Sequence, residues 1–334
     1  MNKKYSELAE LFRSEKTDEE ILDFLLNYHK NDIADMMAGM TEEERKRLYH
    51  LLGAQKVAEI FKYIEEPRKY IRELSVESAA RVISEMDSDD AVDLLEDLDP
   101  EEKEQIVRML DEDAKKDVKM LLSYDEEEIG SCMTTNYICI PENLTIRQAM
   151  SELVKQAGEN DNIMTIYVVD EKGVFAGAID LKDLIRAREN AHLEDLVLKS
   201  YPYVTDHEKI DDCMDRILDY AEDSIPVLSE DKKILGVITS EDLIEMVDNE
   251  MGEDYAKLAG LTAEEDLKEP TLQSMKKRLP WLIILLFLGM AVSSVVGLFE
   301  NVVAVLPIVI CFQSLVLDMA GNVGTQSLAV TIRV

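Results

Sequence analysis

Carboxylates are concentrated in the stretch 241–260, EDLIEMVDNEMGEDYAKLAG, which carries seven of them. Asp242 and Glu245 are three residues apart, and Glu253 and Asp254 follow Glu250 by three and four positions. On a helix each set shares one face, where like charges repel unless a cation lies between them. Most charge runs are solvated faces. The stretch is therefore either an acidic solvated helix or a surface that binds cations.

A second group of carboxylates lies between residues 84 and 113. Asp87 and Asp99 are placed to cap helices, which is the ordinary use of such residues. Asp89 and Asp93 are four positions apart and can present their carboxylates from one helix face. We expect this pair to bind a cation only where another acidic surface lies opposite.

The composition favours cations over anions as ligands. The 334 residues include 70 Asp and Glu against 36 Lys and Arg, a net charge of −34. Such a charge repels phosphate backbones, so no nucleic acid partner is expected. The four cysteines form no CxxC pair and the four histidines have no ligand spacing, which predicts neither a zinc site nor disulfides. The N-terminus has no apolar signal region, which predicts a cytoplasmic location for the acidic part.

Residues 1–131 are predicted to form an all-α, superhelical N-terminal domain, because apolar residues recur there at helical spacing. Thr41 and Glu44 have the spacing of a capping box, and Asp99 followed by Pro100 gives an N-cap and a first helical residue. The units MDSDDAVDLLEDL and LDPEEKEQIVRML resemble each other. They predict short helices that stack as repeats.

The next part of the chain contains two copies of one unit. IYVVDEKGVFAGAIDLKDLI begins at Ile166 and IPVLSEDKKILGVITSEDLI begins at Ile225, and they align without a gap. Each predicts two strands and a helix, after an amphipathic helix and an extended segment, which gives a β-α-β-β-α order. The paired GxI(D/T)xxDLI motifs resemble a tandem pair of cystathionine-β-synthase-type (CBS) domains, an α/β pair over 132–247 with repeats at about 133–190 and 196–247.

The resemblance to CBS pairs implies a site for an adenosine nucleotide such as ATP. Gly236, Thr239 and Asp242 match the glycine, hydroxyl and aspartate that such sites use, whereas Asp180 stands where the first repeat would need a hydroxyl. A nucleotide is therefore expected at the second repeat only. The same three residues are equally consistent with a plain strand-to-helix turn.

Two apolar segments follow in 276–334. The first, 279–299, has 21 uncharged residues, enough to cross a core of about 30 Å. Lys276, Lys277 and Arg278 precede it and predict a cytoplasmic N-terminal side. The second, 302–332, repeats polar residues at every fourth position, which predicts a face that lines a pore or binds neighbouring helices. These residues are Ser314, Asp318, Asn322 and Gln326.

The acidic helical domain, the CBS pair, the acidic connector and the motif AGNVGTQSLAVTIR at 320–333 together resemble the MgtE family of bacterial magnesium transporters. The resemblance implies a multi-pass homodimer in the lipid bilayer of the inner membrane, with the N-terminal and CBS domains in the cytoplasm. It implies that Mg²⁺ bound between those domains and the connector 248–275, a plug helix, closes the pore. The implied ligands are Asp89, Asp93, Asp211, Asp242, Glu245, Glu250, Glu253 and Asp254, and Asn322 lies near the ion path.

This family has five spans, and this chain contains two, so we expect a truncated transporter that does not transport by itself. The alternative is a membrane-anchored CBS protein that senses a nucleotide or ion and regulates a partner. An enzyme is not expected, because the chain has no nucleophile elbow, phosphate loop or metal-ligand motif. Gly252 lowers the helical propensity inside the connector and predicts a break between the Asp242 and Asp254 groups.

Overall fold

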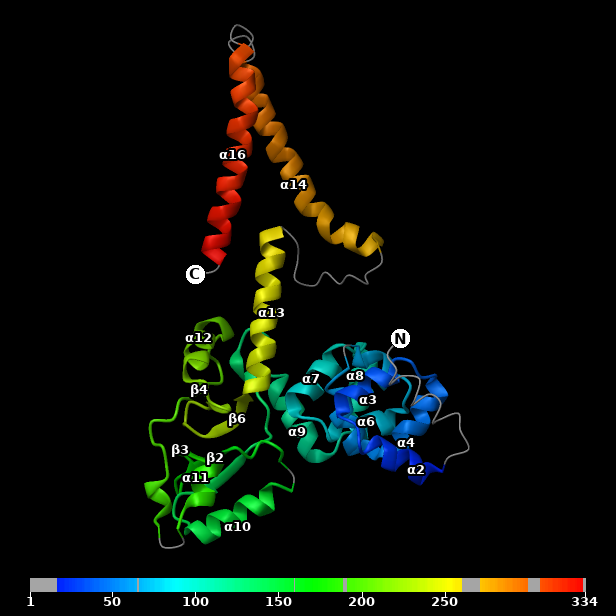
Figure 1. Ribbon diagram of the computed structural model, residues 1–334, viewed down its shortest axis with the longest axis vertical. Helices are drawn as coiled ribbons and strands as arrows, with labels where there is room; N and C mark the ends of the chain where they lie inside the picture. Colours follow the sequence, from blue (N-terminus) through cyan, green and yellow to red (C-terminus); the bar gives the residue numbers. More distant parts are fainter. Residues whose placement is uncertain are drawn as a thin grey trace. The chain divides into compact units, whose positions relative to one another are not determined.

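The computed structural model describes residues 17–64, 66–158, 160–188, 191–259, 271–299 and 307–332. It divides into two compact units, residues 1–243 and 244–334. The first unit contains a helical domain and two β-α-β-β-α repeats, and the second contains most of α13 together with α14 and α16 (Figure 1). The predicted order of helical domain, paired repeats and apolar helices is therefore present.

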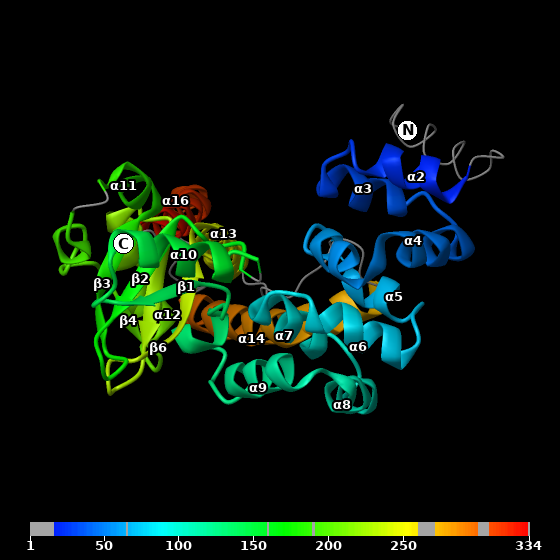
Figure 2. The same ribbon diagram turned by 90° about the horizontal axis from the view of Figure 1, so that it is seen from below.

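The N-terminal domain is a series of short helices that follow one another along an arc (Figure 2). Helix α4 packs on α6, α6 on α8 and α7 on α9, so these helices contact the next helix but one. This is the stacking that the repeated units predict. The helices are α2 (Asp18–Leu25), α3 (Lys30–Met37), α4 (Glu42–Phe61), α5 (Pro67–Ile71), α6 (Val76–Ser84), α7 (Ser88–Glu96), α8 (Pro100–Met109) and α9 (Glu112–Leu121).

Local capping explains where several of these helices begin. The backbone N–H of Thr41 donates to Glu44 Oε2 at 2.8 Å, and the N–H of Glu44 donates to Thr41 Oγ1 at 3.3 Å, which is the predicted capping box. Asp99 is the N-cap of α8 with Pro100 at the first turn, as predicted. The carboxylate of Asp99 also binds the guanidinium of Arg68 at 2.8 Å, which ties α5 to α8.

The two repeats have the same topology. In the first, β1 (Ile138–Pro141) pairs parallel with β2 (Thr165–Val169), and β2 pairs antiparallel with β3 (Phe175–Asp180). In the second, β4 (Val204–Thr205), β5 (Ser224–Leu228) and β6 (Ile234–Thr239) pair in the same way. The helices are α10 (Ile146–Gln156), α11 (Leu181–Arg186), α12 (Ile210–Tyr220) and α13 (Ser240–Ala259).

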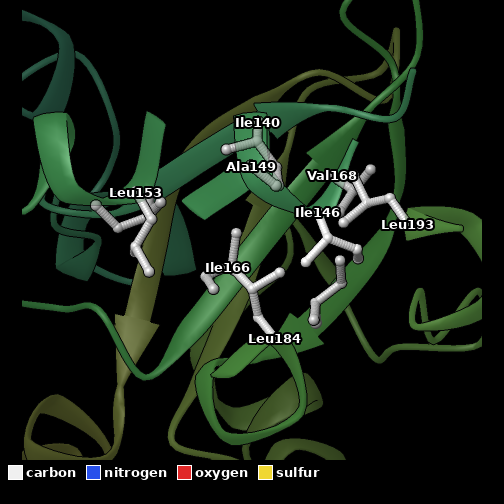
Figure 3. Packing of buried hydrophobic residues seen from close by; sticks show 10 residues of the cluster. Ile140, Ile146, Ala149, Leu153, Ile166, Val168, Leu184 and Leu193 are labelled. Atoms are coloured by element: carbon white, nitrogen blue, oxygen red, sulfur yellow. The ribbon is translucent and has the colours of Figure 1, made fainter. Parts of the chain in front are cut away.

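The core of the first repeat lies between its sheet and its helices. Figure 3 shows Ile140, Ile166 and Val168 from the strands meeting side chains of α10 and α11, and all of them are almost fully buried. Burial of each such side chain contributes about 1.5–3 kcal/mol. The helix-side residues that the figure labels are Ile146, Ala149, Leu153 and Leu184.

Two matched glycines let each repeat receive the segment that precedes the other. Thr134 pairs with Val237 beside Gly236, and Leu198 pairs with Ala178 beside Gly177. A Cβ on Gly236 would lie 2.7 Å from the carbonyl oxygen of Thr134. On Gly177, where φ is +147°, it would lie 2.5 Å from the carbonyl oxygen of Leu198. The glycine of the repeated motif is therefore required for close backbone contact between the repeats. This contact explains the presence of Gly236 without a bound nucleotide.

Helix α13 differs from the expectation for the connector. It runs without interruption from Ser240 to Ala259 and includes Gly252, so the predicted break at Gly252 is wrong. One interior glycine costs only about 1 kcal/mol. The surrounding Glu, Met, Lys, Ala and Leu are good helix formers and outweigh this cost.

The apolar segments form two long helices, α14 (Thr271–Leu298) and α16 (Pro307–Ile332). Within the described residues, one stretch is long and apolar enough to cross a membrane, Arg278–Leu298, with a mean hydropathy of 2.4 and no buried part. The first predicted span falls in this stretch. The second, 302–332, is helical over its described part, and its membrane crossing stays a prediction.

Candidate metal site

The N-terminus of α7 is held against the first repeat by side-chain hydrogen bonds. Asn136 Nδ2 donates to Asp87 Oδ1 at 2.8 Å. The backbone N–H of Thr135 donates to Ser88 Oγ at 2.9 Å, and its hydroxyl donates to Asp117 Oδ2 of α9 at 2.8 Å. Asp87 is the N-cap residue of α7, as predicted, but its side chain makes no cap hydrogen bond and binds the neighbouring domain instead.

Beside this contact lies a cavity of about 280 Å³, walled by the helical domain and by both repeats. Its lining contains six carboxylates and one ammonium group, so its formal charge is strongly negative. The carboxylates belong to Asp87, Asp89, Asp161, Asp223, Glu241 and Asp242, and the ammonium belongs to Lys62. We refer to this space as the acidic cavity.

Asp89 is the most unusual residue of the acidic cavity. Its Oδ1 atom is inaccessible to solvent and has no hydrogen-bond partner. Burial raises the pKa of Asp89 well above its usual range, and the charges of Asp242, Asp90 and Asp87 raise it further. Burial also raises the pKa of Asp90 to about 7, although the charge of Lys62 opposes the rise. A buried carboxylate oxygen without a donor is costly, and a cation removes that cost.

Asp242 faces the same cavity from the first turn of α13. Its Oδ2 atom accepts from the backbone N–H of Thr239 at 2.7 Å, and its own N–H donates to Thr239 Oγ1 at 3.3 Å. Burial raises the pKa of Asp242, although hydrogen bonds from the backbone and side chain of Thr239 to its carboxyl group oppose the rise. Thr239 and Asp242 thus form the strand-to-helix turn, and Asp242 also contributes its charge to the cavity.

The structure brings Asp89 and Asp242 together but leaves other predicted ligands apart from the acidic cavity. Asp93 is exposed and does not line it, although its charge, with those of Asp89 and Asp242, raises the pKa of Cys132 beyond the effect of burial. Asp211 is exposed in the first turn of α12, and Glu245 is exposed on α13.

Three predicted ligands of the connector lie on the described backbone of α13, and their side chains are outside the described part of the structure. They are Glu250, Glu253 and Asp254. The predicted pore residues lie on one helix, α16, at intervals of four positions, and their side chains are exposed. They are Asp318, Asn322 and Gln326.

Sequence reasoning missed three residues of this site. Asn136 orders the loop of the first repeat, because its Oδ1 accepts the backbone N–H of Asp161 at 2.9 Å. Asn162 lines the cavity with a buried Nδ2 that has no partner. Lys62 follows the last residue of α4 and carries the cavity's ammonium group. No local pattern marks these residues, since their partners are far away in the sequence.

The residues of the acidic cavity fit a hydrated magnesium ion. Within the described residues, no three His, Cys, Asp or Glu side chains are arranged to hold a metal by themselves. Mg²⁺ does not need such a cage, because it usually keeps several waters and contacts one or two carboxylates. Six waters occupy roughly 180 Å³, and the cavity offers about 280 Å³. The unpartnered Asp89 oxygen supplies the hard ligand that this ion prefers.

The chain combines an acidic helical domain in contact with a CBS-type pair and a long apolar helix that passes the length and hydropathy test for a membrane span. Comparison with known families agrees. Residues 28–127 match the MgtE intracellular N domain, and residues 127–190 and 193–249 match the CBS domain. The chain is 39% identical to the magnesium transporter MgtE of Enterococcus faecalis over its whole length and 74% of that protein. The chain belongs to the MgtE family.

Further relatives and solved structures are similar to a large part of this chain. The magnesium transporter MgtE of Bacillus subtilis is 32% identical over 63% of this chain and 47% of its own length. A crystal structure of the soluble part of a magnesium transporter has a TM-score of 0.70 and 30% identity, over 74% of this chain and 98% of that one. The cytosolic domain of the Mg²⁺ channel MgtE in complex with ATP has a TM-score of 0.65 and 26% identity, over 72% and 99%.

Proposed function

We propose that this chain is the magnesium-sensing part, with the first membrane helices, of a magnesium transporter of the bacterial inner membrane. Its helical and CBS domains face the cytoplasm, and Mg²⁺ bound in the acidic cavity holds them together and closes the pore. The observation that carries this proposal is the solvent-inaccessible, unpartnered oxygen of Asp89 in a cavity that also receives Asp242. The family relationship supports the identity of the ion.

The proposed mechanism is electrostatic. Without a divalent ion, the carboxylates of α7 and of the first turn of α13 repel one another across the cavity. Bound Mg²⁺ supplies two positive charges there and makes contact between the domains favourable. Asp89 and Asp242 would hold the ion directly or through its waters, and the side chain of Asn162 lies in the same lining. One weak site is insufficient for a sharp gate, since a shift from 1:99 to 99:1 needs about 5.5 kcal/mol.

The remaining parts of the proposal follow from the family resemblance. They are a homodimer, a plug formed by the connector with Glu250, Glu253 and Asp254, additional ligands at Asp93, Asp211 and Glu245, and a pore face at Asp318, Asn322 and Gln326. The continuous α13 supports a direct connection between sensing and gating, because Asp242 and the connector carboxylates share one helix.

ATP is the second candidate ligand, because one similar structure was solved with ATP bound. Of the three residues predicted for a nucleotide, Thr239 and Asp242 line the acidic cavity, whereas Gly236 packs against Thr134 and Met133. The carboxylates of this cavity repel phosphates and attract cations. The charge of the site therefore favours magnesium over a nucleotide at the second repeat.

The test is a magnesium titration of the full chain in detergent, read by hydrogen exchange. The backbone N–H of Thr135 donates to Ser88, so slower exchange at this amide reports contact between the domains. We expect Mg²⁺ to slow the exchange in the natural protein and to have a weaker effect in Asp89→Asn and Asp242→Asn. Asp23→Asn, an exposed change on α2, is the matched control.

Two results would count against the sensor. One is exchange at Thr135 that does not change with Mg²⁺ in the natural protein. The other is an equal response in Asp89→Asn and Asp23→Asn. Protection by ATP alone, with no response to Mg²⁺, would instead support the membrane-anchored nucleotide sensor that regulates a partner.

A further inference from the structure

Lys62 is a cation of the protein itself that lies among the carboxylates of the acidic cavity. It follows α4, and its side chain is 27% exposed. The Nζ atom is 3.3 Å from Asp87 Oδ2, 3.8 Å from Asp90 Oδ2 and 3.3 Å from Glu241 Oε2. Asp87 and Asp90 belong to the helical domain, whereas Glu241 opens α13 in the second repeat. One ammonium group therefore joins two domains.

The charges around Lys62 are unequal. Three carboxyl groups surround one ammonium group, so two formal negative charges are uncompensated when Asp90 is ionised and one when it is protonated. Lys62 therefore compensates part of the repulsion that would otherwise separate α7 from α13, and it does so at every magnesium concentration.

Asp87 links this ion cluster to the other contact between the domains. Its Oδ2 binds Lys62, while its Oδ1 accepts from Asn136 of the first repeat. The two oxygen atoms of the Asp87 carboxylate thus bind different donors, the ammonium group of Lys62 and the amide group of Asn136. Loss of the ammonium group would leave Asp87 with one neutral partner and unbalanced repulsion from Glu241, which opposes the contact of α7 with both repeats.

We propose that Lys62 is a built-in counter-cation that holds the helical domain against the second CBS repeat when magnesium is absent, and so limits how strongly this contact depends on magnesium. Lys62 is a positioning residue, since it acts through Asp87, Asp90 and Glu241. The part that concerns magnesium rests on the proposed function. The part that concerns the metal-free contact does not.

The experiment compares variants of the full chain in detergent by hydrogen exchange at Thr135, first in chelator and then at saturating Mg²⁺. In chelator, we expect Lys62→Gln to exchange about five-fold faster than the natural protein, which corresponds to about 1 kcal/mol. Saturating Mg²⁺ restores its protection, because the ion replaces the missing charge. Lys62→Arg keeps a cation at this place and behaves like the natural protein.

Two controls separate this role from a general effect of charge or folding. Lys46→Gln removes the same charge from an exposed pair with Glu42 on α4 and should leave the exchange at Thr135 unchanged. Glu241→Gln removes the partner in the other domain, so its effect and that of Lys62→Gln should not add in the double variant.

Several outcomes would overturn the proposal. They are equal exchange at Thr135 in Lys62→Gln and Lys46→Gln in chelator, additive effects of Lys62→Gln and Glu241→Gln, or faster exchange throughout α4 and α6, which would mean that Lys62 only stabilises the helical domain. A natural protein that does not respond to Mg²⁺ would defeat the proposed sensor, whereas the comparison in chelator would still decide the role of Lys62.

Discussion

Asp89 combines a partner-free carboxylate oxygen with a raised pKa, so its ionised form destabilises the metal-free protein. Asp89→Asn removes that charge. We expect the thermal midpoint of the metal-free protein to rise at an alkaline pH that ionises Asp89, because removing an uncompensated buried charge relieves about 1–3 kcal/mol. The rise in thermal midpoint that Mg²⁺ causes should be smaller in Asp89→Asn than in the natural protein. Thermal melts in chelator and in Mg²⁺ measure both effects, and a lower midpoint in chelator would contradict them.

His207, which lies away from the metal site, should make the stability of the protein depend on pH. His207 Nδ1 is 2.9 Å from Glu128 Oε1. This hydrogen bond raises the pKa of His207, and the charge of Asp206 adds to it. Because the pKa of His207 is raised in the folded state, its protonated form stabilises the fold. This stabilisation is complete below the ordinary histidine pKa and is lost as the pH rises through the raised pKa of the folded state. The melting difference between the natural protein and His207→Gln should therefore decrease from about pH 6 to about pH 8.

The structure sharpens what can be learned from residue types. Asp89 and Asp242 were predicted as ligands from the family resemblance; both line one cavity, and their role as ligands stays a prediction. Lys62 and Asn136 were missed, because a lysine after a helix and an asparagine in a loop have no local signature. Their partners, Glu241 and Asp87, are distant in the sequence. Contacts between domains are set by tertiary packing, which single-sequence patterns do not encode.

At the scale of elements, local signals were reliable where the physics is local. The capping box at Thr41 and the start of α8 at Asp99 and Pro100 depend on a few adjacent residues, and both are present. The apolar patterns of the two aligned copies also predicted the order of strands and helices in each repeat. The break at Gly252 was wrong, because one unfavourable residue was given more weight than the helix formers around it.

Gly236 gives a prediction about how the repeats fit together. In Gly236→Ala the new Cβ would approach the carbonyl oxygen of Thr134 to 2.7 Å, so the segment that precedes the first repeat must shift. Faster hydrogen exchange is expected at Thr134 and Thr135, with weaker contact to Ser88. Gly252→Ala, where a Cβ meets nothing within 4 Å, is the control and should stabilise α13. Unchanged exchange in Gly236→Ala would refute the close-contact explanation.

At the scale of the whole molecule, the acidic cavity and the apolar helix lie in separate compact units. The acidic cavity lies within residues 1–243, and the candidate span lies within 244–334. The chain covers 74% of the Enterococcus faecalis relative and 47% of the Bacillus subtilis relative. Magnesium sensing and membrane insertion are therefore the proposed properties that measurements on this chain test first.

The orientation of α14 in the membrane is a prediction that can be tested on this chain. Lys276, Lys277 and Arg278 precede the uncharged part of Arg278–Leu298, and positive residues stay on the cytoplasmic side. The variant Lys276→Cys is made in a background without the four native cysteines. Its thiol should react with a membrane-impermeant maleimide in inverted bacterial vesicles. It should not react in intact cells whose outer membrane is permeabilised. Ser123→Cys, in the helical domain, should share this behaviour. Labelling of Lys276→Cys from outside the cell would place the sensor on the wrong side of the membrane for cytosolic magnesium and would refute the proposed gating.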